Sequence, residues 1–231
     1  MKDMLGDRMK RYESVYKQKL IPKLYTIVRI DGKNFHRFTK RFKKPIDEDF
    51  LSLMNRTAMY ITKNTQNAKF GYTQSDEISL LLTDWDNINT EMYFAGNIQK
   101  ITSVISSMTT AFFSSIYAKT YNDFDFPSFD CRVFQLPSRV EVYNYFLWRQ
   151  KDCHRNFINS LAQYHIGKKE IKGWKQPKLI TELEKRGVVV ESVYSRGVLC
   201  FQDGLDTIWK NLEKFQYEKG TLHELTPYPF N

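Results

Sequence analysis

The sequence predicts an α+β fold in which long helices cover a ferredoxin-like antiparallel sheet. The first observation behind this prediction is the order of the segments, because strand-like and helical runs follow one another as strand, helix, strand, strand, helix, strand. The second is the size and composition of the chain. Its 231 residues, 42% hydrophobic and 26% charged, are typical of a soluble globular protein with a sizeable core. We therefore expect a palm-like core over residues 1–136, completed by a mainly helical portion over 137–231.

The first half of the chain supplies helices and the first three strands. Apolar residues recur at helical spacing in two segments, of which Pro22 ends the first and Asp47 is placed to cap the second. The hairpin that follows has an apolar second arm of buried-strand character. The expected elements are a helix at 2–18, a strand at 25–30, a short helix at 33–41, a helix at about 48–66 and a hairpin at 68–83.

The second half begins with the longest helical segment and ends less regularly. Residues 91–121 are apolar over much of a helical surface, and residues 129–136 alternate around Arg132 as a fourth strand. Residues 138–186 are helical in pattern, broken near 166–177 by glycines, lysines and a proline. A final strand or hairpin is expected within 187–201.

Two aspartates at the ends of strand-like runs are the candidate catalytic residues. Asp31 ends the first strand, and Asp76 lies in the polar turn of the hairpin. If the first strand lies beside the hairpin, the two carboxylates converge at one end of the sheet. Carboxylates this close repel each other unless they are protonated or bridged by cations, and oxygen ligands suit Mg²⁺. The pair thus predicts a two-metal site for nucleotidyl transfer, with the carbonyl of Gly32 completing one coordination sphere.

The same aspartates have a plainer interpretation, which the spacing alone favours. Asp31 would cap the following helix and Asp76 would make a turn, both common roles for this residue. Ser75 and Glu77 flank Asp76, and strand alternation would turn them away from the metal side, so that they orient the site or contact a base.

The segment after Gly32 is the candidate phosphate-binding element. Glycine lets the backbone approach a ligand closely, and the amides of residues 33–36 open a helix, where anions bind. His36 could meet a phosphate there, although a lone histidine is more often packed or exposed than functional.

The charge of the chain is compatible with a nucleic-acid partner. The net charge is +9 and the pI is about 9.3, with lysines gathered at 40–44 and 168–178. A solvated helix face is the alternative for either cluster.

The three cysteines follow no metal-binding pattern, which indicates reduced thiols. Without a secretory signal or a membrane-spanning stretch in the sequence, we expect a cytoplasmic protein.

Four ordered motifs resemble those of the tRNA-His guanylyltransferase superfamily. They are Arg29-Ile-Asp-Gly-Lys-Asn-Phe-His-Arg-Phe, Gly71-Tyr-Thr-Gln-Ser-Asp-Glu, Phe129-Asp-Cys-Arg-Val and Trp148-Arg-Gln-Lys-Asp-Cys-His-Arg-Asn. The resemblance covers most of residues 20–200. It implies that residues 1–136 form the catalytic core and that the helical portion at 137–231 also binds RNA. It implies two Mg²⁺ ions per active site at Asp31, Gly32 and Asp76, ATP and GTP or another NTP as substrates, tRNA or tRNA-like RNA as partner, and a tetramer.

The resemblance also extends the set of candidate site residues. The nucleotide-binding candidates are Lys33, Asn34, Phe35, His36, Lys44, Asp47, Ser75 and Glu77. The candidates for contacts to RNA or phosphate are Arg29, Lys100, Arg132, Trp148, Arg149, His154, Asn156 and Arg196. Aromatic, cationic and amide groups together suit RNA, although a helix that packs its tryptophan inward and exposes its arginines would show the same pattern.

The implied activity is template-dependent 3′→5′ addition of nucleotides to the 5′ end of tRNA, that is, 5′-end repair. The run His154-Arg-Asn-Phe-Ile-Asn-Ser160 departs from the His-Ile-Asn-Asn-Leu-Tyr-Asn of the eukaryotic enzymes, and Asn97 stands at the position of one of their arginines. These departures resemble the guanylyltransferase-like branch of the superfamily. The alternatives are a tRNA-His guanylyltransferase that adds a single G, a nucleotide cyclase, and a non-catalytic RNA-binding protein.

Overall fold

The centre of the molecule is a six-stranded antiparallel sheet with the strand order β4-β1-β3-β2-β5-β6. A computed structural model describes residues 4–190, 195–203 and 206–211. The strands are β1 (Tyr25–Gly32), β2 (Ala68–Gln74), β3 (Glu77–Leu82), β4 (Phe129–Leu136), β5 (Val198–Asp203) and β6 (Asp206–Asn211). The predicted α+β fold and its antiparallel sheet are confirmed, and β4 has the predicted bounds.

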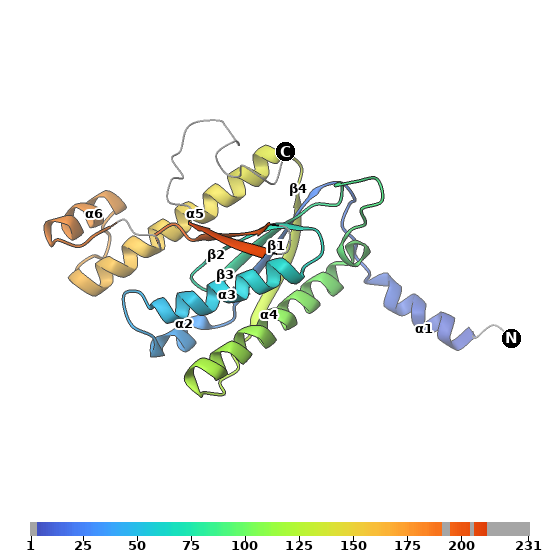
Figure 1. The fold of residues 1–231 in the computed structure, drawn as a ribbon, viewed down its shortest axis with the longest axis horizontal. Helices are drawn as coiled ribbons and strands as arrows, with labels where there is room; N and C mark the ends of the chain where they lie inside the picture. The colour runs from blue at the N-terminus through green and yellow to red at the C-terminus, as the bar shows by residue number, and fades with distance from the viewer. Residues whose placement is uncertain (1–3, 191–194, 204–205, 212–231) are drawn as a thin grey trace.

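Helices cover both faces of the sheet (Figure 1). On one face lie α3 (Glu48–Asn64) and α4 (Ile98–Tyr121), and α5 (Arg139–Ala162) lies on the other. Alternation along β1 explains the two cores: Val28 and Ile30 pack in the cluster with α3 and α4, whereas Ile27 packs with residues of α5. The end of β1 is therefore held from both sides.

The start of α4 differs from the prediction. The predicted helix at 91–121 begins only at Ile98, because Phe94 and Ala95 adopt left-handed backbone angles within the 3₁₀ turn Tyr93–Gly96. Asn97 then caps α4 by accepting a hydrogen bond from the backbone amide of Lys100 at 3.0 Å. The first two turns of the predicted helix are therefore absent, and the α-helix begins after the cap at Asn97.

The N-terminal helix is present, but it contributes nothing to the core. The predicted helix at 2–18 is α1 (Met4–Val15), and none of its residues is buried. In Figure 1 it projects away from the sheet. Its apolar residues Met4, Leu5, Tyr12 and Val15 are exposed, as is Tyr16 directly after the helix.

The C-terminal portion combines a helical arm with two strands. After α5 the chain makes a π-helical turn (Gln163–Gly167) and enters α6 (Gln176–Lys185), which packs on the end of α5 around a separate small core. The chain then returns to the sheet as β5, which pairs with β2. The two predicted portions thus share one sheet, and no helix among the described residues is long and apolar enough to cross a membrane.

Candidate active site

Backbone pairing brings Asp31 and Asp76 together at one end of the sheet. Asp31 is the last residue of β1 that pairs with β3, where it lies opposite Glu77. Asp76 precedes Glu77 in the turn between β2 and β3, and its carbonyl accepts a hydrogen bond from the amide of Gly32 at 3.1 Å. The predicted convergence of the two aspartates therefore follows from the register of β1 against the hairpin.

The electrostatics of Asp76 show how close the acidic groups lie. Burial raises the pKa of the Asp76 carboxyl above its ordinary value, and the negative charges of Asp31 and Glu77 raise it further. A hydrogen bond from the Ser75 hydroxyl to Asp76 Oδ1, 3.0 Å long, acts in the opposite direction. Asp76 is thus a carboxylate whose ionisation is opposed by its surroundings.

The donor set fits a hard divalent cation. The Asp31 side chain is 34% exposed, so one face of the pair remains open to a ligand. A cation between the two carboxylates would relieve the repulsion that raises the pKa of Asp76. Within the described ranges no group of three or more His, Cys, Asp or Glu side chains is arranged to hold a metal. The other ligands would then be water, substrate phosphate and backbone oxygens, which is how Mg²⁺ is usually bound. The role of the Gly32 carbonyl stays a prediction.

Arg132 of β4 borders the carboxylate pair. Its Nη2 lies 4.0 Å from Asp31 Oδ2 and 3.3 Å from Asp130 Oδ1, and its side chain is exposed. Arg132 thus places a positive charge at the edge of the site, where the prediction of a phosphate contact requires one.

The predicted phosphate cradle is shorter than expected. The helix predicted at 33–41 is α2 (Phe35–Phe38), four residues long, followed by a 3₁₀ turn (Thr39–Arg41). Asn34 is in a left-handed conformation, and the amide of Lys33 already donates to the carbonyl of Ser128 at 2.8 Å. Only the amides of residues 34–36 remain for a phosphate, while the Phe35 ring itself lies in the core.

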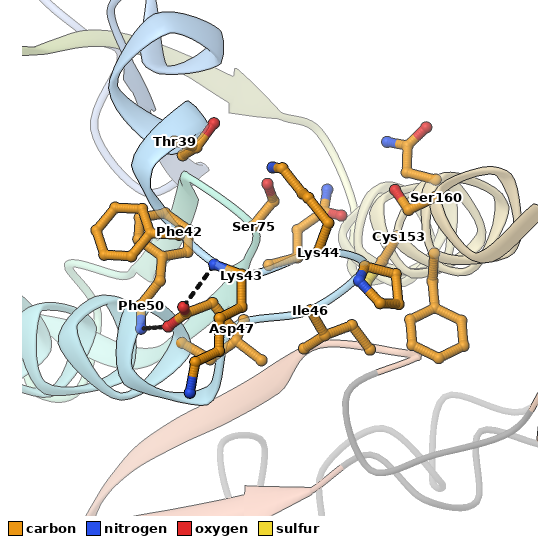
Figure 2. A pocket seen from close by; sticks show the side chains of 15 residues that line it. Thr39, Phe42, Lys43, Lys44, Ile46, Asp47, Phe50, Ser75, Cys153 and Ser160 are labelled. Atoms are coloured by element: carbon orange, nitrogen blue, oxygen red, sulfur yellow. Dashed lines mark hydrogen bonds between the residues drawn. The ribbon is translucent and has the colours of Figure 1, made fainter. Parts of the chain in front are cut away.

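A cavity of about 190 Å³ opens beside the turn that carries Asp76. Figure 2 shows Lys44 entering it from the loop before α3, Ser75 from the hairpin turn, and Cys153 and Ser160 from α5. The cavity also includes Asn156, which was predicted to contact RNA. Its remaining lining residues include Gln74 and Phe157, which sequence reasoning missed, because nothing in a single sequence indicates that α5 faces the loop at 39–50.

Asp47 lines the same cavity, but its carboxylate accepts hydrogen bonds from two backbone amides. Its Oδ1 accepts from the amide of Phe50 at 2.9 Å and its Oδ2 from the amide of Lys43 at 2.8 Å (Figure 2). The predicted helix cap is confirmed, and the cap also shapes the loop that carries Lys44. In the same cavity, burial raises the pKa of the Cys153 thiol to about 12, so this cysteine is no nucleophile at neutral pH.

Glu77 and two arginines form a buried ion cluster below the carboxylate pair. The Glu77 carboxylate accepts two hydrogen bonds from Arg149, from Nε to Oε1 and from Nη2 to Oε2, both 2.7 Å long. Arg29 Nε lies 3.1 Å from Glu77 Oε2, within ion-pair distance but without hydrogen-bond geometry. Arg149 is only 5% exposed. This placement argues against the predictions that Arg149 and Arg29 contact RNA and that Glu77 contacts a nucleotide.

The other predicted RNA contacts lie on the surface. Trp148 is 53% exposed and lines, with His154 and Arg196, a second cavity of about 360 Å³ on another side of α5. Lys100 is exposed in the first turn of α4. His36, which was predicted to contact a nucleotide, is exposed on α2. The structure therefore separates the candidates on α5, since Asn156 lines the first cavity and His154 the second.

The fold and the acidic site define a class of nucleotidyl-transferring enzyme, and comparisons with known proteins specify it. A family model described as tRNAHis guanylyltransferase matches residues 6–137, more than half of the chain. The chain is 32% identical over 211 residues to an uncharacterised protein of Acanthamoeba polyphaga mimivirus, covering 81% of this chain and 72% of that one. It is 29% identical over 225 residues to the tRNA(His) guanylyltransferase of Schizosaccharomyces pombe, covering 89% and 83%.

Solved structures agree. A bacterial tRNA(His) guanylyltransferase-like protein in complex with ATP matches with a TM-score of 0.87 at 37% identity, over 91% of this chain and 93% of that one. A structure described as the same kind of protein in complex with GTP matches with a TM-score of 0.75, also at 37% identity, over 89% of each chain. The chain belongs to the tRNA-His guanylyltransferase family, whose members are nucleotidyltransferases.

Proposed function

We propose that the protein is a Mg²⁺-dependent, template-directed 3′→5′ nucleotidyltransferase that adds nucleotides to the 5′ end of tRNA or a similar RNA. The observation that carries the proposal is the meeting of Asp31 and Asp76 at the end of the sheet, joined by the bond from Gly32 to Asp76. The 37% identity to bacterial guanylyltransferase-like proteins that bind ATP and GTP supports these nucleotides as substrates.

The reaction joins an incoming nucleotide to an activated 5′ end. A 5′-monophosphate first takes up AMP from ATP, which releases pyrophosphate. The 3′-hydroxyl of an NTP then forms a bond to the 5′ phosphorus, and AMP leaves. Bound cations would activate the attacking hydroxyl and hold the triphosphate.

The residues of this chain have distinct tasks in that reaction. Asp31 and Asp76 hold the cations, and the open side of Asp31 admits the phosphates. Lys44 and Ser75 reach the cavity of about 190 Å³ from two different segments, which suits contacts to a triphosphate. Base pairing with the template strand selects the nucleotide.

The test is extension of a tRNA that lacks its first 5′ nucleotide, with labelled NTPs. We expect a longer product only with Mg²⁺ and a template nucleotide opposite the gap. Asp31→Asn and Asp76→Asn should each lower the rate by about 10³-fold or more, since each removes a ligand of the site. Near-normal rates in either variant would contradict the assignment, and Mg²⁺-independent RNA binding without extension would favour a non-catalytic protein.

A second candidate is addition of a single G to tRNA-His, which the matching family model favours. Comparison of full-length tRNA-His with truncated tRNAs separates the two activities. Release of a cyclic nucleotide from an NTP without RNA would instead indicate a cyclase.

The assembly is proposed to be a homo-oligomer, a tetramer by family resemblance. The exposed apolar residues of α1 support association, since none of them is covered by the part of the chain that the structure describes. Light scattering of the purified protein tests this. A monomer at micromolar concentration would contradict it.

A further inference from the structure

The buried ion cluster beneath the carboxylate pair joins three elements of the fold. Glu77 begins β3, Arg29 lies in β1, and Arg149 comes from α5 across the sheet face. The carboxylate of Glu77 is 6% exposed, as is the side chain of Arg149. Such a pair is costly to bury unless each charge is matched, and here both oxygens of Glu77 are engaged.

Apart from the exposed Arg155, the cluster is balanced in charge. Arg29 and Arg149 contribute two positive charges, and Glu77 and Asp152 contribute two negative ones. Asp152 Oδ2 accepts from Arg149 Nη2 at 3.0 Å and also pairs with Arg155, which is exposed. Without Glu77, two largely buried arginines would remain beside the carboxylates that we assign to the cations.

Glu77 is also the residue that touches both aspartates through the backbone. It follows Asp76 in the chain, and it is the cross-strand partner of Asp31. Any displacement of Glu77 therefore moves both members of the pair. The hydrogen bonds from Arg149 of α5, 72 residues further along the chain, hold Glu77 and so fix the turn that carries Asp76.

We propose that Glu77 is a positioning residue that, held by Arg149, fixes the turn of Asp76 and cancels the arginine charges that would otherwise repel divalent cations from Asp31 and Asp76. The inference rests on the proposed function in taking these aspartates as the cation ligands. It assigns Glu77 neither to the metal nor to the nucleotide, and it gives Arg149 an internal task in place of an RNA contact.

The two possible roles of Glu77 make opposite predictions for a double variant. If Glu77 balances charge, Glu77→Gln weakens cation binding and the further change Arg149→Gln restores part of it, because the excess positive charge is removed. If Glu77 ligates the metal, the second change restores nothing, since the lost ligand is still missing.

The experiment measures binding of Mn²⁺ alone, without nucleotide or RNA, by the electron paramagnetic resonance signal of the free ion. The variants are Glu77→Gln, Arg149→Gln and the double variant, each checked for folding by thermal unfolding. Arg155→Gln is the matched control, because it removes an arginine of the same helix that pairs with Asp152 at the surface. We expect Glu77→Gln to weaken Mn²⁺ binding by roughly tenfold or more, as for other residues that support metal ligands.

The double variant should bind Mn²⁺ more tightly than Glu77→Gln, and Arg155→Gln should bind as the wild type does. A double variant as weak as Glu77→Gln, or a Glu77→Gln variant that binds normally, would overturn the proposal. Should one of the single variants fail to fold, the comparison of the double variant with the wild type still decides: binding within a few fold supports charge balance, and lost binding refutes it. Because no RNA enters the measurement, failure of the proposed activity would be seen separately, as wild-type protein that binds Mn²⁺ yet extends no tRNA.

Discussion

The backbone amide of Gly32 donates a hydrogen bond to the carbonyl of Asp76 at 3.1 Å. Gly32, which follows Asp31 in the chain, is therefore hydrogen-bonded to the backbone of the second candidate catalytic residue, Asp76. Because the pairing of Asp31 with Glu77 acts beside it, the separation of the carboxylates is set by the backbone of β1 and of the hairpin turn. Once the backbone is in place, only the side-chain rotamers of Asp31 and Asp76 remain to be set.

Substitution of Gly32 tests how closely the end of β1 is packed against the hairpin turn and the ring of Phe35. A Cβ on Gly32 would lie 2.3 Å from Cδ2 of Phe35, whose ring is buried among Phe38, Phe113 and Phe129. Gly32→Ala should lower the free energy of unfolding by about 1–3 kcal/mol, as overpacking does. It should also lower nucleotidyl transfer, since the displaced residue carries the bond to Asp76.

Thermal unfolding and a tRNA extension assay on the same preparation would check both effects. The control is Gly32→Ala combined with Phe35→Leu, which makes room for the methyl group and should recover part of the stability. If Gly32→Ala alone were as stable and active as the wild type, the ring of Phe35 would not be held as the structure shows.

The raised pKa of Asp76 predicts a pH dependence of activity. Cation binding requires ionised Asp76, so at a fixed Mg²⁺ concentration that does not saturate the site the rate should rise with pH through a pKa above the ordinary value for aspartate. Ser75→Ala removes the hydrogen bond that lowers this pKa and should move the acidic limb to higher pH. An acidic limb that does not move in Ser75→Ala would contradict the assignment of the limb to Asp76.

The same pKa fixes the sign of a stability effect in metal-free buffer. The folded protein holds the proton of Asp76 more tightly than the unfolded chain does, so stability falls as the pH rises from the ordinary aspartate pKa through the raised one. Asp76→Asn removes this loss. Its gain in unfolding free energy over the wild type should grow across that window, measured by denaturant unfolding at several pH values.

How much of the site could be predicted depends on the range of the interactions that build it. Residues 129–136 show strand alternation in the sequence, and the cap at Asp47 is a local signal, so both were predicted correctly. The convergence of Asp31 and Asp76 required only one assumption, that the first strand pairs with the hairpin.

The parts that could not be predicted depend on contacts between distant segments or on unusual backbone. The bond from Arg149 to Glu77 spans 72 residues, and without it Arg149 resembles a surface cation next to an exposed tryptophan. The late start of α4 arises from left-handed angles at Phe94 and Ala95, two residues that rarely adopt them. An acidic residue that opens a buried, mostly apolar strand, as Glu77 does before residues 78–82, was the one signal of a buried partner.

The cavity beside the hairpin turn predicts that nucleotide binding can be weakened without a change in RNA binding. Ser160 lies on the α5 wall of this cavity of about 190 Å³, and a phenylalanine there would occupy part of it. Ser160→Phe should raise KM for the nucleotide by roughly tenfold while RNA binding is unchanged, since the loss is in binding that ground and transition states share. Gln163→Phe, at an exposed residue of the π-helical turn directly after α5, is the control and should keep the KM of the wild type. Equal KM values in all three proteins would place the nucleotide elsewhere.

The helical arm formed by the end of α5, the π-helical turn and α6 predicts the salt dependence of RNA binding. Its own small core holds Ile158, Leu179 and Leu183, which leaves Lys168, Lys169 and Lys172 exposed on its surface. Each lysine that meets a phosphate releases a counterion, so the logarithm of the RNA affinity should fall with the logarithm of salt concentration by about 0.9 per contact for a duplex.

Changing these three lysines to glutamine should therefore lower the steepness of that line by about 2–3 and weaken binding alike for all sequences. Lys119→Gln, at the C-terminal end of α4, removes an equally exposed charge from another surface and should leave the slope unchanged. Filter binding between low and moderate salt measures both. The same slope in the triple variant and the wild type would show that the arm lies outside the RNA interface. Lys43 and Lys44 would then be the next residues to test, because they line the cavity itself.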